Sequence, residues 1–475
     1  MTETSAAGGW SEIFSPRYAA TTTMLCLGVA LLAFNAFLAA TALPTAVIEF
    51  DGLALISWAT TLYLVFAIIG GAGAALVKQA MGARNALLVS AGLFLLGSLI
   101  AAGAGSMEQV LVGRVIQGTG EGVVAAICYT LIPELFPSRL VPKVFGMQAM
   151  MWGIAAFGGP AGVGALTEAI SWRAAFFVNV PMVLVFAALV FVVAPKTRPS
   201  GALPGFPGIR LLAVGLGIVL VAFAGIVSPL AAAALLVAAA VLLVATVLLD
   251  RRARSRLFPG DAFTLSSVTG TGLWVMLLMP IAGGTPGIFI VLLLEKLWDF
   301  GPMLAGALGA LMAIAWSTAA ITVANVSSPA RRLALVRVGP AVTTLGLAGI
   351  LTACLSGQLA VLVVSQLALG AGFGMSWSYL SLILMEASTG PERDRTSALL
   401  PTLQSAGNAI GAAIAGLAAN AGGFAVAITR DEVRQGIAPA LVTGIIFGLV
   451  GITFAIRTTR LARNAVPTLA AEVPA

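Results

Sequence analysis

The chain has 475 residues, of which 60% are apolar and 9% are charged, and its mean hydropathy is +1.05. Soluble domains carry about 25% charged residues, so this composition excludes a soluble protein and predicts an all-α polytopic membrane protein. The chain has no histidine, its cysteines stand singly, and its net charge of +7 comes from dispersed basic residues. We therefore expect no metal site, no cofactor and no nucleic-acid partner.

Apolar runs of the length that crosses a bilayer, roughly 20 residues, follow one another along the whole chain. The run 263–294 is interrupted by glycines and a proline, and we expect it to form one broken helix. The pair 209–228 and 230–249 is separated only by Pro229. The sequence predicts fourteen transmembrane helices, over 20–46, 54–77, 84–105, 109–133, 143–167, 174–194, 209–228, 230–249, 263–294, 302–324, 334–355, 358–385, 397–424 and 438–457.

The distribution of basic residues predicts the orientation of these helices. With the N-terminus in the cytoplasm, twenty of the 25 Lys and Arg fall in cytoplasmic segments and Arg114 falls within a run. Only four fall in outer segments, namely Arg173, Lys296, Arg430 and Arg434. Cytoplasmic loops are enriched in Lys and Arg. We therefore expect a multi-pass protein of the cytoplasmic (inner) membrane with both termini in the cytoplasm.

A polar stripe interrupts the apolar run 109–133. Arg114, Gln117 and Glu121 are spaced i, i+3 and i+7, so a helix places them on one face. A charged side chain at membrane depth costs at least ~2.5 kcal/mol by insertion scales, and such residues usually serve a function. Small residues between them should let a neighbouring helix approach closely; these are Gly118, Gly120 and Gly122.

Glu121 has two interpretations. It is either a proton-binding site that water reaches alternately from the two sides, or a permanently ionised partner of a basic group on another helix. Arg114 lies roughly 10.5 Å away along the helix axis at 1.5 Å per residue, which is too far for direct pairing. We expect Gln117 or water to link the two charges.

Polar and aromatic residues also interrupt two late runs. Gln404 and Asn408 are spaced i and i+4 and share a face. With Trp377 and Tyr379 they either line a substrate cavity, which we favour, or hydrogen-bond between helices. An aromatic wall of that cavity and an interfacial belt are equally good explanations for the isolated rings of Trp58, Tyr63, Trp274 and Trp316.

Five motifs, in order, resemble those of the major facilitator superfamily, specifically its fourteen-helix drug:proton antiporter branch. The resemblance spans the whole chain and is most specific in its first half. The matching residues are Ala42-Leu43-Pro44, Ser57-Trp58 with Tyr63, Gly113-Arg114 with Gln117, Gly118 and Gly120, Gly159-Pro160 with Gly164, and Ser171-Trp172-Arg173 with Asn179 and Pro181.

This resemblance implies two six-helix bundles with a substrate path between them. The expected divisions are a cytoplasmic tail 1–19, an N-terminal bundle 20–194, a linker with two additional helices 195–262, a C-terminal bundle 263–457 and a cytoplasmic tail 458–475. The expected substrate cavity comprises Asn35, Trp58, Tyr63, Gln117, Trp377, Tyr379, Gln404 and Asn408.

The resemblance also implies a conformational gate, at Gln79, Gly82, Arg84, Gly159 and Pro160. The Gly-Pro pair can instead serve helix packing alone. Two positions depart from the family pattern, which has Asp in place of Asn35 and of Gln79. A charged gate is therefore weakened, and a cation-binding carboxylate on the first helix is missing.

We accordingly predict a secondary active transporter, not an enzyme. It would export a small amphipathic organic compound by alternating access, with Glu121 and Arg114 coupling this export to protons. The chain has no GxxxxGK[ST] loop, which argues against ATP-driven pumping.

Proton-coupled uptake of a small organic anion or metal chelate is the alternative function, and a multi-pass lipid-modifying enzyme is a less favoured one. The expected partners are the substrate, protons and membrane lipids, and the expected state is a monomer.

Overall fold

The computed structural model describes residues 9–51, 55–196, 205, 207–225 and 227–471, and within these residues every regular element is a helix. The N-terminal part contains α1 (Trp10–Ile13), α2 (Ala19–Glu49), α3 (Ile56–Met81), α4 (Ala83–Ala102), α5 (Met107–Leu135), α6 (Val141–Ala169), α7 (Trp172–Phe177) and α8 (Asn179–Val193). The middle contains α9 (Gly208–Ala224) and α10 (Pro229–Arg251). The C-terminal part contains α11 (Val268–Ala282), α12 (Gly284–Trp298), α13 (Pro302–Gly309), α14 (Leu311–Val323), α15 (Pro329–Ser356), α16 (Leu359–Glu386), α17 (Gly390–Ala421), η2 (Phe424–Val426) and α18 (Arg430–Ala471).

The helices follow the predicted apolar runs. The run 263–294 forms one span that is broken at Gly283, between α11 and α12, as its glycines predict. In the described part of the chain, eleven helical stretches are long and apolar enough to cross a membrane, and α9 is a shorter apolar helix. The chain is therefore a multi-pass membrane protein, whereas the count of fourteen spans stays a prediction. At the C-terminus, α18 continues to Ala471, past the predicted bundle end at 457.

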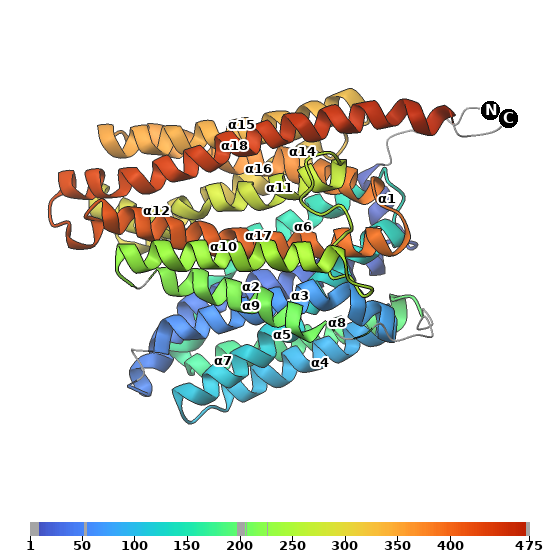
Figure 1. Ribbon diagram of the computed structural model, residues 1–475. Helices are drawn as coiled ribbons and strands as arrows, with labels where there is room; N and C mark the ends of the chain where they lie inside the picture. Colours follow the sequence, from blue (N-terminus) through green and yellow to red (C-terminus); the bar gives the residue numbers. More distant parts are fainter. Residues whose placement is uncertain (1–8, 52–54, 197–204, 206, 226, 472–475) are drawn as a thin grey trace.

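Two groups of helices lie one above the other in Figure 1. Helices α2 to α8 pack on one another and form the N-terminal half, and α11 to α18 form the C-terminal half. Helices α9 and α10 pack as a pair, and α9 contacts α3 of one half and α17 of the other. The inserted pair therefore bridges the two halves along one side.

The two ends of this bundle differ in charge. Helix α1 and the C-terminal end of α18 lie at the same end (Figure 1). We name this the basic end, because basic residues gather where these helices end or begin: Lys78 in the last turn of α3, Arg139 between α5 and α6, Arg251 at the end of α10 and Arg395 near the start of α17. The other end, where α2 and α12 terminate, is named the opposite end.

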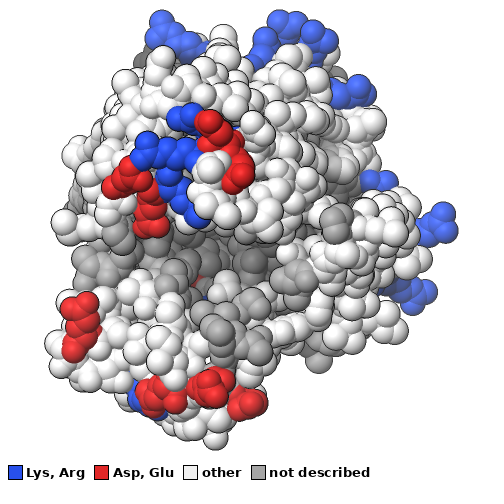
Figure 2. All heavy atoms as spheres, turned by 90° about the vertical axis from the view of Figure 1, so that its left-hand side faces the viewer, with Lys and Arg blue, Asp and Glu red and all other residues white. Residues whose placement is uncertain are grey.

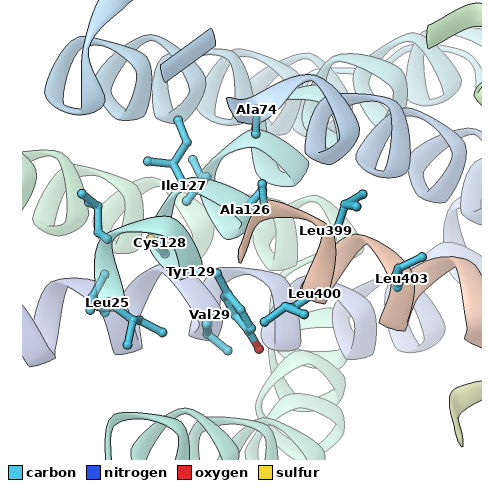
Figure 3. Close-up of a cluster of buried hydrophobic side chains, with 14 of the residues drawn as sticks. Leu25, Val29, Ala74, Ala126, Ile127, Cys128, Tyr129, Leu399, Leu400 and Leu403 are labelled. Atoms are coloured by element: carbon cyan, nitrogen blue, oxygen red, sulfur yellow. The ribbon is translucent and has the colours of Figure 1, made fainter. Parts of the chain in front are cut away.

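The halves meet in an apolar seam on the basic-end side of the bundle. Helix α17 packs against α3 and α5, while α14 and α16 pack against α6. Figure 3 shows this seam, with Leu399, Leu400 and Leu403 of α17 facing side chains of α5 that include Tyr129. A β-carbon on Gly71 of α3 would collide with the side chain of Thr402 of α17. The two helices are therefore in close contact at this point of the seam.

At the opposite end the halves are separate on the surface. Figure 2 views this end and shows a hollow between an upper lobe, the C-terminal half, and a lower lobe, the N-terminal half. Asn408 is exposed although it lies in the middle of α17. We conclude that the structure represents a conformation that is closed at the basic end and open at the opposite end.

Glycines hold α5 between α3 and α4, as the sequence predicts. A β-carbon on Gly118 or Gly122 would collide with a carbonyl oxygen of α3, and one on Gly120 with a carbonyl oxygen of α4. Close backbone approach of this kind replaces the missing hydrophobic driving force between helices in a membrane.

We expect Gly122→Ala to destabilise the protein by about 1–3 kcal/mol, because the added methyl group has backbone atoms of Ala67 in its way. Thermal unfolding in detergent measures the effect. Gly92→Ala is the matched control: that glycine is exposed on α4 with nothing within 4 Å of its would-be β-carbon. An Ala in an exposed helix position should be neutral or stabilising. Equal stability of the two variants would contradict the close packing of α5.

Candidate functional site

A buried polar network lies inside the N-terminal half and connects α2 to α5. The guanidinium of Arg114 donates from Nη1 to Oδ1 of Asn35, at 3.2 Å, and the amide nitrogen of Asn35 donates to Oε2 of Glu121, also at 3.2 Å. Arg114 Nε donates to the carbonyl oxygen of Ala59 on α3, at 3.2 Å. We call this arrangement the Arg114 network. Asn35, on another helix, thus links the two charges.

Gln117 has a different role from the one predicted, since it does not link Arg114 to Glu121. Its side-chain oxygen accepts from Arg114 Nη1 at 2.6 Å, and its nitrogen donates to Oγ of Ser98 on α4 at 2.9 Å. Asn179, at the start of α8, also donates to Ser98, at 3.3 Å. Gln117 therefore continues the Arg114 network away from Glu121, towards α4 and α8.

Tyr63 of α3 completes the Arg114 network. Its ring lies below the guanidinium, with Arg114 Cζ 4.0 Å from the ring centroid. Three buried polar atoms of these neighbouring residues have no hydrogen-bond partner within the described structure: Tyr63 Oη, Arg114 Nη2 and Glu121 Oε1. Buried polar groups are nearly always paired. These three atoms could therefore bind a proton or hydrogen-bond a small polar molecule.

The Arg114 network is sealed in this conformation. Glu121 is 1% exposed, and Arg114, Asn35 and Gln117 are fully buried. The expected direct access of water to Glu121 is therefore absent here, and the reason is packing: α2, α3 and α5 close over the carboxyl group. Access would require a rearrangement of these helices.

A second cluster lies between the two halves. A cavity of about 20 Å³ is lined by aromatic rings and two amides from α5, α6, α14, α16 and α17. We name these residues the central cluster: Tyr129, Phe145, Gln148, Trp152, Trp316, Trp377 and Gln404. Neither amide atom of Gln148, which is 2% exposed, has a partner in the described residues. Aromatic rings beside an unpaired amide are typical of a pocket that binds an amphipathic solute.

A charged bridge joins the halves at the basic end. Lys78 of α3 donates to Glu134 of α5 and, at 2.9 Å, to Asp394 of α17. Lys78 is 6% exposed. Nearby, Nζ of the buried Lys143 donates to the carbonyl oxygen of Ala324 across the halves, at 3.4 Å. We name Lys78, Glu134 and Asp394 the basic-end lock, because separation of α17 from α3 would break it.

At the opposite end, an ion pair fixes α2 to α7 within the N-terminal half. Both oxygens of Glu49 accept from Arg173, at 2.8 and 2.9 Å, and Oε2 also accepts from the Trp172 indole at 2.7 Å. These hydrogen bonds, chiefly those from Arg173, hold the pKa of Glu49 below its usual value. The Ser171-Trp172-Arg173 motif is thereby accounted for as a structural clamp.

Not every residue predicted for the substrate cavity lies in one place. Trp377 and Gln404 are in the central cluster, and Asn408 lies one turn beyond Gln404 towards the hollow. Asn35, Tyr63 and Gln117 belong to the Arg114 network instead. The ring of Trp58 packs edge-on against Phe223 of α9, at 4.9 Å between centroids. The hydroxyl of Tyr379 donates to backbone oxygens of Val323 and Val326 within the C-terminal half. These positions do not support a cavity role for Trp58 or Tyr379.

The predicted gate residues lie within the N-terminal half. Arg84 donates to the carbonyl oxygen of Ala194 at 2.8 and 3.0 Å and thereby holds the end of α8. Gly82 forms the turn between α3 and α4 with φ of 79°, a backbone conformation that suits glycine.

The other predicted gate positions show packing or partial burial. Gly159 packs against Phe37 of α2, Gln79 is half-buried, and the side chain of Pro160 is outside the described part of the structure. Polar contacts between the halves at the basic end are made instead by Lys78, one residue before Gln79, and by Lys143.

Several site residues escaped the sequence analysis. Lys78 was counted only as a topological charge, and Glu134 and Asp394 were not singled out. Ser98 and Gln148 are polar residues within apolar runs, which is the signal that could have found them. The rings of Tyr129 and Trp152 carried no such signal, because aromatic residues are ordinary components of membrane helices.

Comparisons with known proteins agree with this architecture. Residues 25–208 match the family model described as Major Facilitator Superfamily. A protein of Mycobacterium tuberculosis, described as a probable multidrug-efflux transporter, is 32% identical over 447 residues, which covers 90% of this chain and 94% of that protein. Multidrug resistance protein 3 of Bacillus subtilis is 30% identical over 158 residues, or 33% of this chain and 31% of that protein.

Solved structures show the same fold at low identity. A human organic anion transporter superposes with a TM-score of 0.68 at 15% identity, over 93% of this chain and 99% of that one. A proton:xylose symporter superposes with a TM-score of 0.63 at 16% identity, over 90% of this chain and 94% of that one.

Proposed function

The chain belongs to the major facilitator superfamily and is a transporter of small molecules, and on this premise we propose that it exports an amphipathic organic compound in exchange for protons. The carrying observation is Glu121, a carboxyl group buried at membrane depth with one oxygen unpaired. The relative that is named as a probable multidrug-efflux transporter supports export as the direction.

The Arg114 network can store one proton. With Glu121 ionised, its charge is balanced by Arg114 through Asn35; with Glu121 protonated, the network carries one net positive charge. An ionised carboxylate whose nearest donors among the described residues are a neutral amide, that of Asn35, and a neutral hydroxyl, that of Tyr63, is poorly stabilised in a dry site. We propose that Glu121 holds a proton in this sealed conformation and releases it when the rearranged helices admit water from the basic end.

The central cluster offers the substrate site. In the described residues its lining carries rings and amides but no charged side chain. It would stack a flat apolar body and hydrogen-bond a few polar atoms, which suits an uncharged or weakly charged amphipathic compound. Its present volume of about 20 Å³ is too small for such a solute, so binding would require the two halves to part further.

The orientation that goes with this proposal places the basic end, with both termini, in the cytoplasm. The bias of Lys and Arg supports it, and in this orientation the hollow would face outwards. We further propose fourteen spans, a location in the cytoplasmic membrane and a monomeric transport unit, with the halves 20–194 and 263–457 moving about the site.

The second candidate is proton-coupled uptake of a small organic anion or metal chelate. The observation that favours it is Arg114 Nη2, a buried donor with no partner in the described residues. An anion that reached the Arg114 network would find a preformed cation, although the guanidinium is now fully buried.

Transport into vesicles of known orientation tests the proposal. Dyes, antibiotics and organic acids are supplied to inside-out vesicles with an imposed pH gradient, acid inside, with and without an uncoupler. We expect uphill accumulation of lipophilic compounds inside, which the uncoupler abolishes. Accumulation that survives the uncoupler would contradict proton coupling, and uphill uptake of anions into right-side-out vesicles with an acidic outside would favour the second candidate.

Gln148 provides a specific prediction for the central cluster. Gln148→Leu should leave thermal stability unchanged or raised, because no protein hydrogen bond is lost, yet raise the KM for transport about 2- to 10-fold through one lost substrate hydrogen bond. Gln366→Leu is the matched control, since that buried amide donates to Leu308 within the C-terminal half. It should lower stability without changing KM. Loss of stability in Gln148→Leu with an unchanged KM would refute the substrate role.

A further inference from the structure

An elongated cavity lies between the inserted helix pair and both halves of the protein. Its volume is about 420 Å³, and its walls come from α3, α9, α10, α11 and α17. Every lining side chain except those of Thr402 and Arg251 is apolar or aromatic. The cavity contains no residue of the central cluster or of the Arg114 network, so neither proposed site accounts for it. We name it the lateral cavity.

The lateral cavity is bordered by the outer surface of the helix bundle. Val244 and Leu248 of α10 line it and are 56% and 51% exposed. Helix α10 packs chiefly on α9 and makes only slight contact with α17, and Figure 1 shows α10 running alongside α17 on one side of the bundle. These apolar residues at the rim face lipid, so a ligand would enter the lateral cavity from the bilayer.

Arg251 of the lining directly follows Asp250, which is itself outside the lining and has partners of its own. Arg210 pairs with Asp250, which also accepts the backbone N–H groups of Leu257 and Phe258, at 2.9 to 3.0 Å. These bonds hold the chain that follows α10 against the ends of both inserted helices. Asp250 is thereby engaged with Arg210 and the backbone and does not balance the next residue, Arg251.

Among the described residues of the lining, Arg251 is the one that carries a charge. Its Nη2 donates to the carbonyl oxygen of Ala262, whereas Nε is buried with no partner in the described structure. Among the described residues no carboxylate lies within ion-pairing distance of it. A guanidinium that is held in place and lacks a counter-charge, at the end of a membrane helix, matches an anionic group at headgroup depth.

We propose that the lateral cavity binds a single-chain lipid with an anionic headgroup, a long-chain fatty acid, taken from the bilayer. The acyl chain would lie along α10 from Ala240 towards Arg251, a length of roughly 16 Å at 1.5 Å per residue. The carboxylate would bind Arg251. The cavity volume is in the lower part of the range for sites that enclose one small ligand, which suits one chain. Because Ile68 of α3 and Leu403 of α17 both line the cavity, the lipid would contact both halves in the conformation that is closed at the basic end.

Photolabelling tests this assignment. The purified full-length protein in nanodiscs is irradiated with a diazirine analogue of palmitic acid, and labelled peptides are identified by mass spectrometry. We expect label on α10 and α17, and a loss of about tenfold in Arg251→Gln, since one charge-assisted hydrogen bond is removed. Arg252→Gln is the matched control, because that neighbouring arginine is exposed and outside the lining; its labelling should match the wild type.

Two further arms keep the test decisive. Val244→Trp places an indole at the rim, where the exposed position tolerates it, and should reduce labelling even if Arg251→Gln fails to fold. The methyl ester of the probe, which has no charge, should label about tenfold less than the acid. Equal labelling by acid and ester, equal loss in Arg251→Gln and Arg252→Gln, or label spread over the lipid-facing surface would overturn the proposal.

Discussion

Glu121→Gln is expected to abolish uphill transport while leaving the fold intact. Gln keeps an oxygen that can accept from Asn35, as Glu121 Oε2 does at 3.2 Å, so the Arg114 network loses a titratable group and little else. Each charge that crosses 100 mV supplies about 2.3 kcal/mol, which supports a ratio of roughly 50 between the substrate concentrations inside and outside the vesicle. In the variant this concentration ratio should fall to one. The measurement is substrate accumulation in vesicles under an imposed pH gradient, beside downhill exchange of labelled substrate, which should persist.

Two variants make this result specific to the site. Glu108→Gln removes an exposed acid at the start of the same helix, α5, and should transport as the wild type does. In the double variant Glu121→Gln with Asn35→Asp, a carboxyl group returns to the network beside Arg114 Nη1, the atom that now donates to Asn35. We expect partial recovery of proton-driven accumulation. Uphill transport by Glu121→Gln alone would refute the proposed coupling.

Lys78→Ala is expected to shift the protein away from the conformation described here. The substitution removes the cation that pairs with both Glu134 and Asp394 and leaves two like charges facing each other across the seam. Both carboxylates are about a third exposed, so solvent moderates the effect to about 1–2 kcal/mol, a 5- to 30-fold change in the ratio of the two conformations. Spin labels at Ile48 and Met303, exposed on the two halves at the opposite end, would report a larger short-distance population.

Two control variants distinguish the effect of breaking the basic-end lock from a general effect of surface charge. Glu386→Gln removes an exposed acid at the basic end that lies outside the lock and should leave the distance distribution unchanged. Asp394→Ala should act in the same direction as Lys78→Ala, and the two effects should not add, because they remove the same contact. An unchanged distribution in Lys78→Ala would show that the apolar seam alone keeps the basic end closed.

One helix carries a part of each proposed element. Glu121 of the Arg114 network, Tyr129 of the central cluster and Glu134 of the basic-end lock all lie on α5. Glu121 and Glu134 are roughly 20 Å apart along its axis at 1.5 Å per residue. Helix α5 is held by glycine contacts to α3 and α4. A shift of α5 would therefore alter the Arg114 network, the central cluster and the basic-end lock at the same time.

The sequence by itself determined the class of the protein, the approximate positions of its helices and the polar stripe of α5. These are properties of short segments: hydrophobicity decides which segments can cross a membrane, and helical spacing decides that Arg114, Gln117 and Glu121 share a face. The interruption of the run 263–294 followed in the same way from its glycines and proline.

Only the tertiary structure decided which residues meet. Asn35 reaches Glu121 from a helix 86 positions earlier in the chain, and Lys78 reaches Asp394 across 316 positions. Neither contact has a periodicity that marks it, because contacts between helices depend on their packing angles and on small residues at their crossings. For the same reason Trp58, which is as aromatic as Trp377, packs on the inserted pair, while Trp377 lies between the halves.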